Sequence, residues 1–173
     1  NAGRTAAYLF YQSLRGQAGT VLTATSRNQF QGEEARALAF ADEMARLCPN
    51  VDLIDASGGA GLALGTSAKI TAAVQGLKRL LGVYSMGGGN AAIIATLAAL
   101  NLGPDLFVAH DLDRENRQLL RQGRLGYVLH HDLSADLDSA LQHITAFHKL
   151  RPPVPDGETA DVQIITPANC PVA

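Results

Sequence analysis

Cysteine and clustered positive charge are scarce in this sequence, and their scarcity argues against several classes of protein. Two cysteines in 173 residues form no disulfide framework and suggest no redox motif. The formal net charge is -2 and no lysine and arginine run is present, which argues against a nucleic-acid surface in this segment. No apolar stretch reaches membrane-spanning length and no charged leader precedes one, so we expect no membrane partner.

The residues that are present suit one globular domain, because 47% of them are hydrophobic and can bury a substantial core. The chain starts at Asn1 without an initiator methionine and passes almost directly into a helical face formed by Ala6, Phe10 and Leu14. We therefore expect it to be a piece of a longer protein.

Apolar runs typical of buried strands alternate with amphipathic helical patterns along the whole chain. The strand-like runs are 20–24, 51–54, 81–85, 106–109, 127–130 and 162–166. The last of the helical patterns has its apolar face at Leu137, Leu141, Ile144 and Phe147. Strict alternation of this kind predicts right-handed crossovers and an α/β fold, a three-layer doubly wound parallel sheet covered on both sides.

The alternation breaks once, between residues 151 and 161, where Pro152, Pro153, Pro155 and Gly157 indicate a linker. The strand-like run that follows needs a partner. The sequence therefore divides into a lobe over 1–150, a linker over 151–161 and a terminal strand and tail over 162–173.

Polar side chains follow two successive strands, at the point where each strand ends. Asp111 comes after one, and His131 and Asp132 come after the next, with Asp113 placed to cap the helix between them. In an open parallel sheet, ligands bind outside the carboxyl ends of the strands. A polar ligand site at this edge is the leading hypothesis, and helix caps or a solvated loop are the alternative.

Two catalytic interpretations of the glycine-rich stretch near residue 87 fail on spacing. Gly87, Gly88 and Gly89 precede a helix, but they match neither G-x-G-x-x-G nor a P-loop and no lysine follows, so a tight turn or a close backbone approach to a ligand is favoured over a phosphate cradle. Ser85 is preceded by Gly82, whereas a nucleophile elbow needs glycine at position 83. We expect no enzyme.

A metal site built from His110, Asp111, His131 and Asp132 is chemically conceivable, because imidazole and carboxylate suit several divalent ions. Adjacent residues on a strand point to opposite faces, so each pair offers at most one ligand. We expect neither a metal nor another cofactor.

Several stretches carry a family resemblance in the correct order: AGRTAAYLF, SRNQFQGEEARALAF, VYSMGGGNAAIIATLAAL, VAHDL, YVLHHDL and VQIITPANCP. Over roughly Gly3 to Asn169 the chain resembles the C-terminal lobe of the effector-binding module of LacI-family transcriptional regulators. That module is similar to the periplasmic ribose-binding type of sugar receptor. The resemblance implies a type I periplasmic-binding-protein-like lobe.

The resemblance also assigns ligand-binding residues on the second of these stretches. Arg36 fits the family's ligand-binding arginine and Phe40 its aromatic residue, with Ala39 where the family has glycine. No tryptophan is present to stack on a sugar, and Phe30 is the aromatic residue nearest the expected rim. Phe30 is therefore either a ligand contact or loop packing.

The remaining assigned residues lie at strand ends. Met86 and Gly87 stand where the family usually carries Asn-Asp, which leaves the polar contact to Asn90. Asp111 matches the aspartate that binds ligand hydroxyls, and His131 replaces the usual glutamine.

The function implied by the resemblance is that of a sensor. A small sugar or polyol effector would bind between two lobes, and their closure would alter the geometry of a cytoplasmic homodimer. DNA would be bound only through an N-terminal helix-turn-helix that lies outside this chain. The alternative is a periplasmic sugar-binding receptor of an ABC-type uptake system, which would carry a signal peptide upstream instead.

Overall fold

The computed structural model describes residues 1–26, 31–153, 155 and 161–171, and it forms one six-stranded sheet of order β2-β1-β3-β4-β5-β6. The strands are β1 (Gly19–Ala24), β2 (Val51–Asp55), β3 (Gly82–Ser85), β4 (Leu106–His110), β5 (Tyr127–His130) and β6 (Gln163–Ile165). The first five are parallel, which confirms the predicted α/β fold. β6 departs from it, because it pairs antiparallel to β5 with Val128 opposite Ile165.

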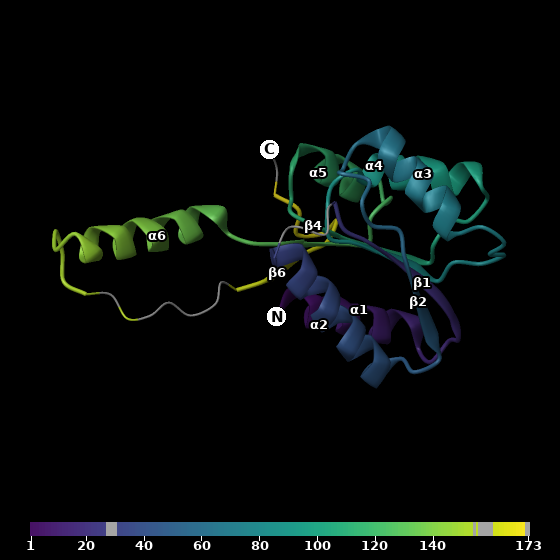
Figure 1. Ribbon diagram of the computed structural model, residues 1–173, viewed down its shortest axis with the longest axis horizontal. Coiled ribbons are helices and arrows are strands. Elements are labelled where there is room, and N and C mark those ends of the chain that lie inside the picture. Colours follow the sequence, from purple (N-terminus) through teal and green to yellow (C-terminus); the bar gives the residue numbers. More distant parts are fainter. Residues whose placement is uncertain (27–30, 154, 156–160, 172–173) are drawn as a thin grey trace.

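Helices cover both faces of the sheet, as predicted (Figure 1). α1 (Ala2–Leu14) and α2 (Gln31–Leu47) lie on one face, and α3 (Ala63–Ala73), α4 (Asn90–Ala99) and α5 (Arg114–Arg121) lie on the other. Consecutive strand residues supply separate cores, since Val83 is buried with the α3–α5 layer and Tyr84 with the α1–α2 layer. This alternation produces the three layers.

Local sequence signals set the ends of α5 as expected. The carboxylate of Asp113 accepts a hydrogen bond from the backbone N–H of Asn116 at 2.7 Å, which caps the helix. Gly123 follows the helix with φ +68°, a left-handed conformation that glycine adopts without strain. The cap and the glycine hold the connection between β4 and β5.

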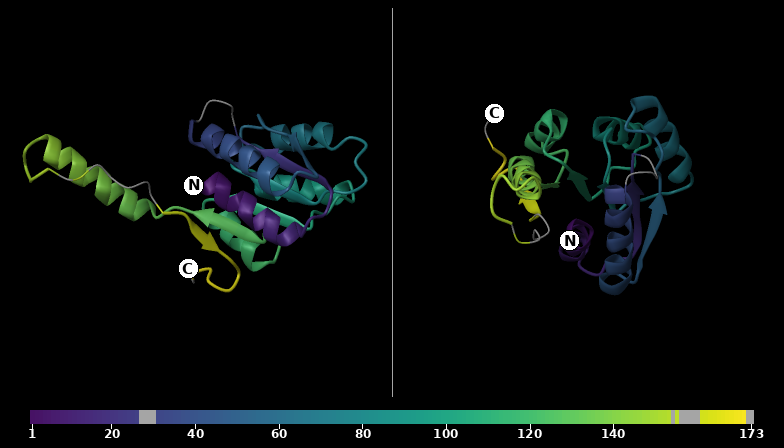
Figure 2. Two further views of the ribbon diagram at one scale, coloured as in Figure 1. Left: turned by 90° about the horizontal axis from the view of Figure 1, so that it is seen from below. Right: turned by 60° about the vertical axis from the view of Figure 1, so that its left-hand side comes forward.

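The last helix, α6 (Leu133–Phe147), extends away from the sheet (Figure 2). None of its residues is buried, and Leu137, Leu141 and Phe147 are 65%, 58% and 84% exposed. The sequence pattern correctly indicates an amphipathic helix, but the expectation that it covers this sheet is wrong. No helix in the described part of the chain is long and apolar enough to span a membrane.

Candidate functional site

Three passages of the chain meet at the carboxyl ends of the parallel strands. These are the start of α1 at Asn1, the exit from β5 at His131 and the approach to β6 at Val162, and all three line one cavity of about 280 Å³. The other described residues that line it are Ala2, Gly3, Ala35, Arg36 and Ala39. The structure thus places Arg36 and His131, two of the residues predicted to bind ligand, on one cavity.

Gly3 explains how α2 comes close enough to deliver Arg36. A Cβ atom at Gly3 would collide with the backbone of α2 at Arg36 and Phe40, so only glycine allows this approach of α1 and α2. Phe40 then anchors α2 on the sheet, with its ring centroid 4.5 Å from that of Tyr84.

A buried pair of polar side chains lies beside Arg36 and His131. Tyr84 Oη and His110 Nε2 are 2.7 Å apart, and the His110 ring stacks on that of His131 with centroids 6.5 Å apart. Burial lowers the pKa of His110 to about 3, and the positive charge of Arg36 adds to this effect. Burial also raises the pKa of Tyr84, which keeps the phenol protonated. At neutral pH, His110 and Tyr84 are therefore both uncharged.

Two imidazole nitrogens in this cluster have no hydrogen-bond partner among the described residues. They are Nδ1 of His110 and Nε2 of His131, and both atoms are buried. A buried polar atom without a partner costs roughly 1–3 kcal/mol, so a ligand or water that pairs with these atoms is favoured.

Asp111 is held at the end of β4 in a left-handed backbone conformation, with φ +61° and an exposed side chain. Asn116 Nδ2 donates to the carbonyls of His110 and Asp111, at 2.8 Å each. Asn90 Nδ2 in turn donates to Asn116 Oδ1 at 2.8 Å. Asn90 is 1% exposed, so its observed contact is with this network, and its direct contact with ligand stays a prediction.

The segment at Met86 and Gly87 packs closely against the end of β1. Met86 is 2% exposed and belongs to the core beneath α1 and α2. A Cβ atom at Gly87 would collide with the backbone of Ser26, whose N–H and hydroxyl both donate to the carboxylate of Glu33. The close approach seen here is to the protein's own backbone, and contact of Gly87 with a ligand stays a prediction. Phe30 lies outside the described residues.

The residues after β5 have separate roles. The carboxylate of Asp132 accepts hydrogen bonds from the backbone N–H groups of Ser134 and Ala135, at 3.1 Å each, so it caps α6. His130 Nδ1 accepts from the backbone N–H of Leu112 and steadies the neighbouring loop. Only His131 of this group lines the cavity.

Sequence reasoning missed Tyr84 and treated His110 only as a metal ligand. A signal was present, because both residues belong to apolar strand-like runs and each has a polar tip that needs a partner when buried. The observed register pairs Tyr84 with Val108, which places His110 two residues further along β4 on the same face.

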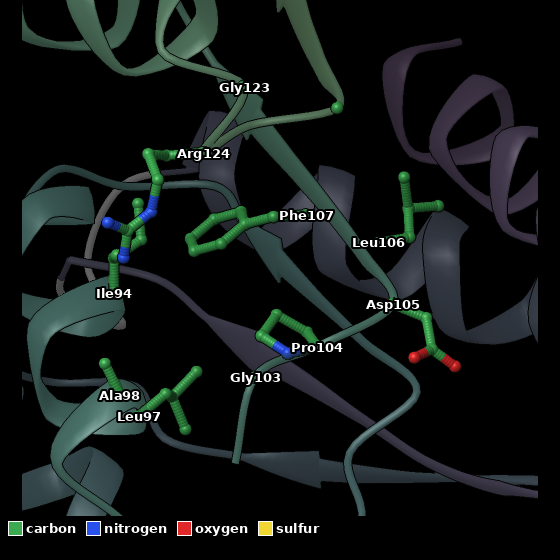
Figure 3. Close-up of a pocket in the computed structure, with 11 residues that line it drawn as sticks. Ile94, Leu97, Ala98, Gly103, Pro104, Asp105, Leu106, Phe107, Gly123 and Arg124 are labelled. Carbon is green, nitrogen blue, oxygen red and sulfur yellow. The ribbon is translucent and has the colours of Figure 1, made fainter. Parts of the chain in front are cut away.

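A second cavity of about 290 Å³ lies at the opposite end of the strands, between α4, the start of β4 and Gly123 (Figure 3). Its charged lining residues are Asp105, which is ion-paired with Arg79 at 2.8 Å, and Arg124. Because Asp105 already has an ion-pair partner, the cavity beside Arg36 is the better candidate for a ligand site.

No group of three or more His, Cys, Asp or Glu residues suited to a metal ion occurs in the described chain.

Comparisons with protein-family profiles and with curated proteins found no match. Solved structures do match. The arabinose-binding protein AraP from Geobacillus stearothermophilus is 17% identical with a TM-score of 0.78, over 98% of this chain and 61% of that one. GanP, a glucose-galactose binding protein from the same organism, is 11% identical with a TM-score of 0.85, over 99% and 61%.

A protein from Bacteroides fragilis, assigned to the LacI transcriptional regulators, is 13% identical with a TM-score of 0.80, over 97% of this chain and 59% of its own. At such low identity these likenesses show the fold alone. The fold is that of the type I periplasmic-binding-protein-like proteins, and the chain spans about three fifths of the length of these neighbours.

Proposed function

We propose that this chain is the ligand-sensing lobe of a LacI-type transcriptional regulator, which binds a small sugar or polyol between two lobes. The observation that carries the proposal is the cavity at the carboxyl ends of the strands, where Arg36 and His131 meet beside three passages of the chain. The structural neighbours named as sugar-binding proteins and as a regulator support the class.

The exposed face of α6 supports a two-lobe protein. Leu137, Leu141 and Phe147 form an apolar surface that this lobe does not cover, and about two fifths of each neighbour's chain lies outside the match. In the proposal a second lobe packs on this surface. The polypeptide then leaves the first lobe after His131 and returns before Val162, so that both crossings border the ligand cavity.

The proposed chemistry divides between donors and an acceptor. Arg36 supplies several N–H donors in one plane, and Asp111 supplies a carboxylate that accepts from paired hydroxyls. Closure shifts the regulator only if the ligand binds the closed arrangement more tightly than the open one. Arg36 and His131 lie beside the crossings, where lobe movement would change their distance from ligand held by the other lobe.

The proposal places the protein in the cytoplasm as a homodimer, with DNA bound by a separate N-terminal helix-turn-helix. A periplasmic receptor of an ABC-type uptake system is the second candidate, because a periplasmic solute binding protein with bound D-allose is also among the structural neighbours, with a TM-score of 0.78. Cell fractionation separates them. A cytoplasmic protein supports the regulator, and a periplasmic one with a cleaved signal peptide supports the receptor.

Thermal unfolding of the full-length protein tests ligand binding itself, with a panel of sugars, sugar alcohols and sugar phosphates. Ligand at 100 times its dissociation constant adds about 2.7 kcal/mol of stability, which is readily measured. We expect one class of compound to stabilise the wild type and to lose its effect in Asp111→Ala. A well-folded protein that no compound stabilises would contradict the proposal.

A further inference from the structure

Among the described residues that line the cavity beside Arg36, side-chain hydrogen-bond donors outnumber acceptors. The arginine only donates. Apart from Asn1 and His131, the other described residues that line the cavity are alanine, glycine and valine, whose side chains offer no acceptor. A neutral sugar hydroxyl both donates and accepts, whereas a carboxylate or phosphate only needs donors. The lining therefore suits an oxyanion better than a hydroxyl.

The positive charge of Arg36 is not neutralised by an ion pair in the described part of the lobe. The two ion pairs found among the described residues are Arg46 with Glu43 and Arg79 with Asp105, and neither involves Arg36. The carboxylate that follows His131 in the chain is that of Asp132, which is occupied by the N-terminus of α6. A half-buried guanidinium without a counter-charge favours an anionic partner.

The imidazoles of His131 and His110 also favour an anionic partner. His131 lines the cavity with a buried Nε2 that has no partner among the described residues, and the stacked His110 also has an unpaired buried nitrogen. An imidazole can present N–H to an acceptor, and His131 shares the cavity lining with the guanidinium of Arg36. An anion between Arg36 and His131 would satisfy both.

We propose that the ligand is an acidic sugar, whose carboxylate or phosphate binds between Arg36 and His131. The inference rests on the proposed sugar-binding function and specifies the ligand class. Asp111 remains available at the end of β4 for the hydroxyls of the same molecule.

NMR titration of the full-length protein tests the inference, because the imidazole signal of His131 reports on the cavity that this residue lines. The probes are glucose, glucuronate, glucose 6-phosphate and inorganic phosphate, and the His131→Gln variant identifies the His131 signal. We expect glucuronate or glucose 6-phosphate to shift that signal at concentrations at least about ten-fold lower than glucose, since charge-assisted hydrogen bonds are the strong ones. The two acidic sugars distinguish a carboxylate from a phosphate.

Variants of Arg36 test whether its positive charge causes the preference for an anionic ligand. Arg36→Gln should weaken binding of the acidic sugar roughly ten- to hundred-fold, since hydrogen bonds to charged groups are the strong ones, while Arg36→Lys should retain the preference over glucose. Arg46→Gln, which removes an exposed arginine from the same helix away from the cavity, is the matched control and should change nothing.

The outcomes also distinguish this inference from the function on which it rests. Equal shifts from glucose, glucuronate and glucose 6-phosphate would overturn the anionic ligand and leave sugar binding intact. A shift from inorganic phosphate with none from any sugar would support the anion site and contradict sugar binding. No shift from any probe would overturn both.

Discussion

Tyr84 Oη lies 2.7 Å from His110 Nε2, across the neighbouring strands β3 and β4, and the two residues are 0% and 3% exposed. The pair joins the core beneath α1 and α2 to the candidate ligand cavity, because His110 also stacks on His131. A hydrogen bond at this depth keeps two polar tips satisfied inside an otherwise apolar layer.

The buried state of His110 predicts acid sensitivity of folding. Its pKa is about 3 in the fold, below the ordinary value of 6.5. Between those values the unfolded chain binds a proton that the folded chain does not, so stability is full above pH 6.5 and falls as the pH drops towards 3. This one group should remove about 2 kcal/mol from the unfolding free energy between about pH 7 and about pH 5.

Urea unfolding of wild type and His110→Gln at both pH values measures this contribution. The variant should lose about 2 kcal/mol less than wild type on the same change of pH, because the other histidines contribute equally to both proteins. Equal losses in the two proteins would show that His110 titrates normally in the fold.

Removing the Tyr84 hydroxyl should destabilise the lobe, and its cost should depend on whether His110 is present. Tyr84→Phe leaves His110 Nε2 buried without a partner, at a cost of about 1–3 kcal/mol. In a double-mutant cycle with His110→Phe, the two single costs should exceed the cost of the double variant by roughly 1 kcal/mol. Additive costs measured by urea unfolding would contradict the interaction.

Most of the fold could be predicted from the sequence because each strand–helix unit has a local signal. The apolar run at 106–109 and the cap at Asp113 identify β4 and α5 from neighbouring residues alone. The direction of β6 could not be predicted this way, because its pairing with β5 depends on where the chain returns after α6. The position of α6 could not be predicted either, because an apolar helix face does not show which part of a protein covers it.

The candidate site was predictable only in part. His131 was singled out by its position at a strand end and Arg36 by the family resemblance, and both line the same cavity. The pairing of Tyr84 with His110 could not be predicted, because it depends on strand order and register, which come from tertiary structure. Asp132 occupies a strand end too, yet its carboxylate caps α6, and spacing alone does not distinguish a cap from a ligand contact.

The Asn90–Asn116 network should be essential to the shape of the β4 end. Asn116→Ala removes the amide that donates to the carbonyls of His110 and Asp111, and it leaves buried polar groups unpaired. We expect a loss of about 2–3 kcal/mol in unfolding free energy and weaker ligand binding. The control is Gln118→Ala, an exposed position on the same helix, which should cost under about 0.5 kcal/mol.

Gly87 should resist substitution for a steric reason. A Cβ atom there collides with Ser26, so Gly87→Ala must push the ends of β1 and β3 apart at the site. We expect a loss of about 1–3 kcal/mol by thermal or urea unfolding. Gly103→Ala is the matched control, since a Cβ atom at Gly103 meets nothing within 4 Å, and a similar loss in that variant would remove the steric explanation.

The apolar face of α6 should contribute nothing to the stability of this lobe alone. Leu137 and Leu141 are 65% and 58% exposed, so Leu137→Lys with Leu141→Lys should leave the unfolding free energy of the isolated chain within about 0.5 kcal/mol of wild type. The same change should reduce self-association measured by sedimentation, because an exposed apolar surface promotes it.

Two further measurements serve as comparisons for the double variant on α6: a lysine substitution at a buried position, and the same double variant in the full-length protein. Leu97, which is 1% exposed, should not tolerate lysine, because burying an unpaired ammonium group costs several kcal/mol. In the full-length protein, the double variant on α6 should instead destabilise the structure by at least about 2 kcal/mol, since the proposed second lobe covers the helix there. Equal tolerance in both proteins would mean that no second lobe packs on α6.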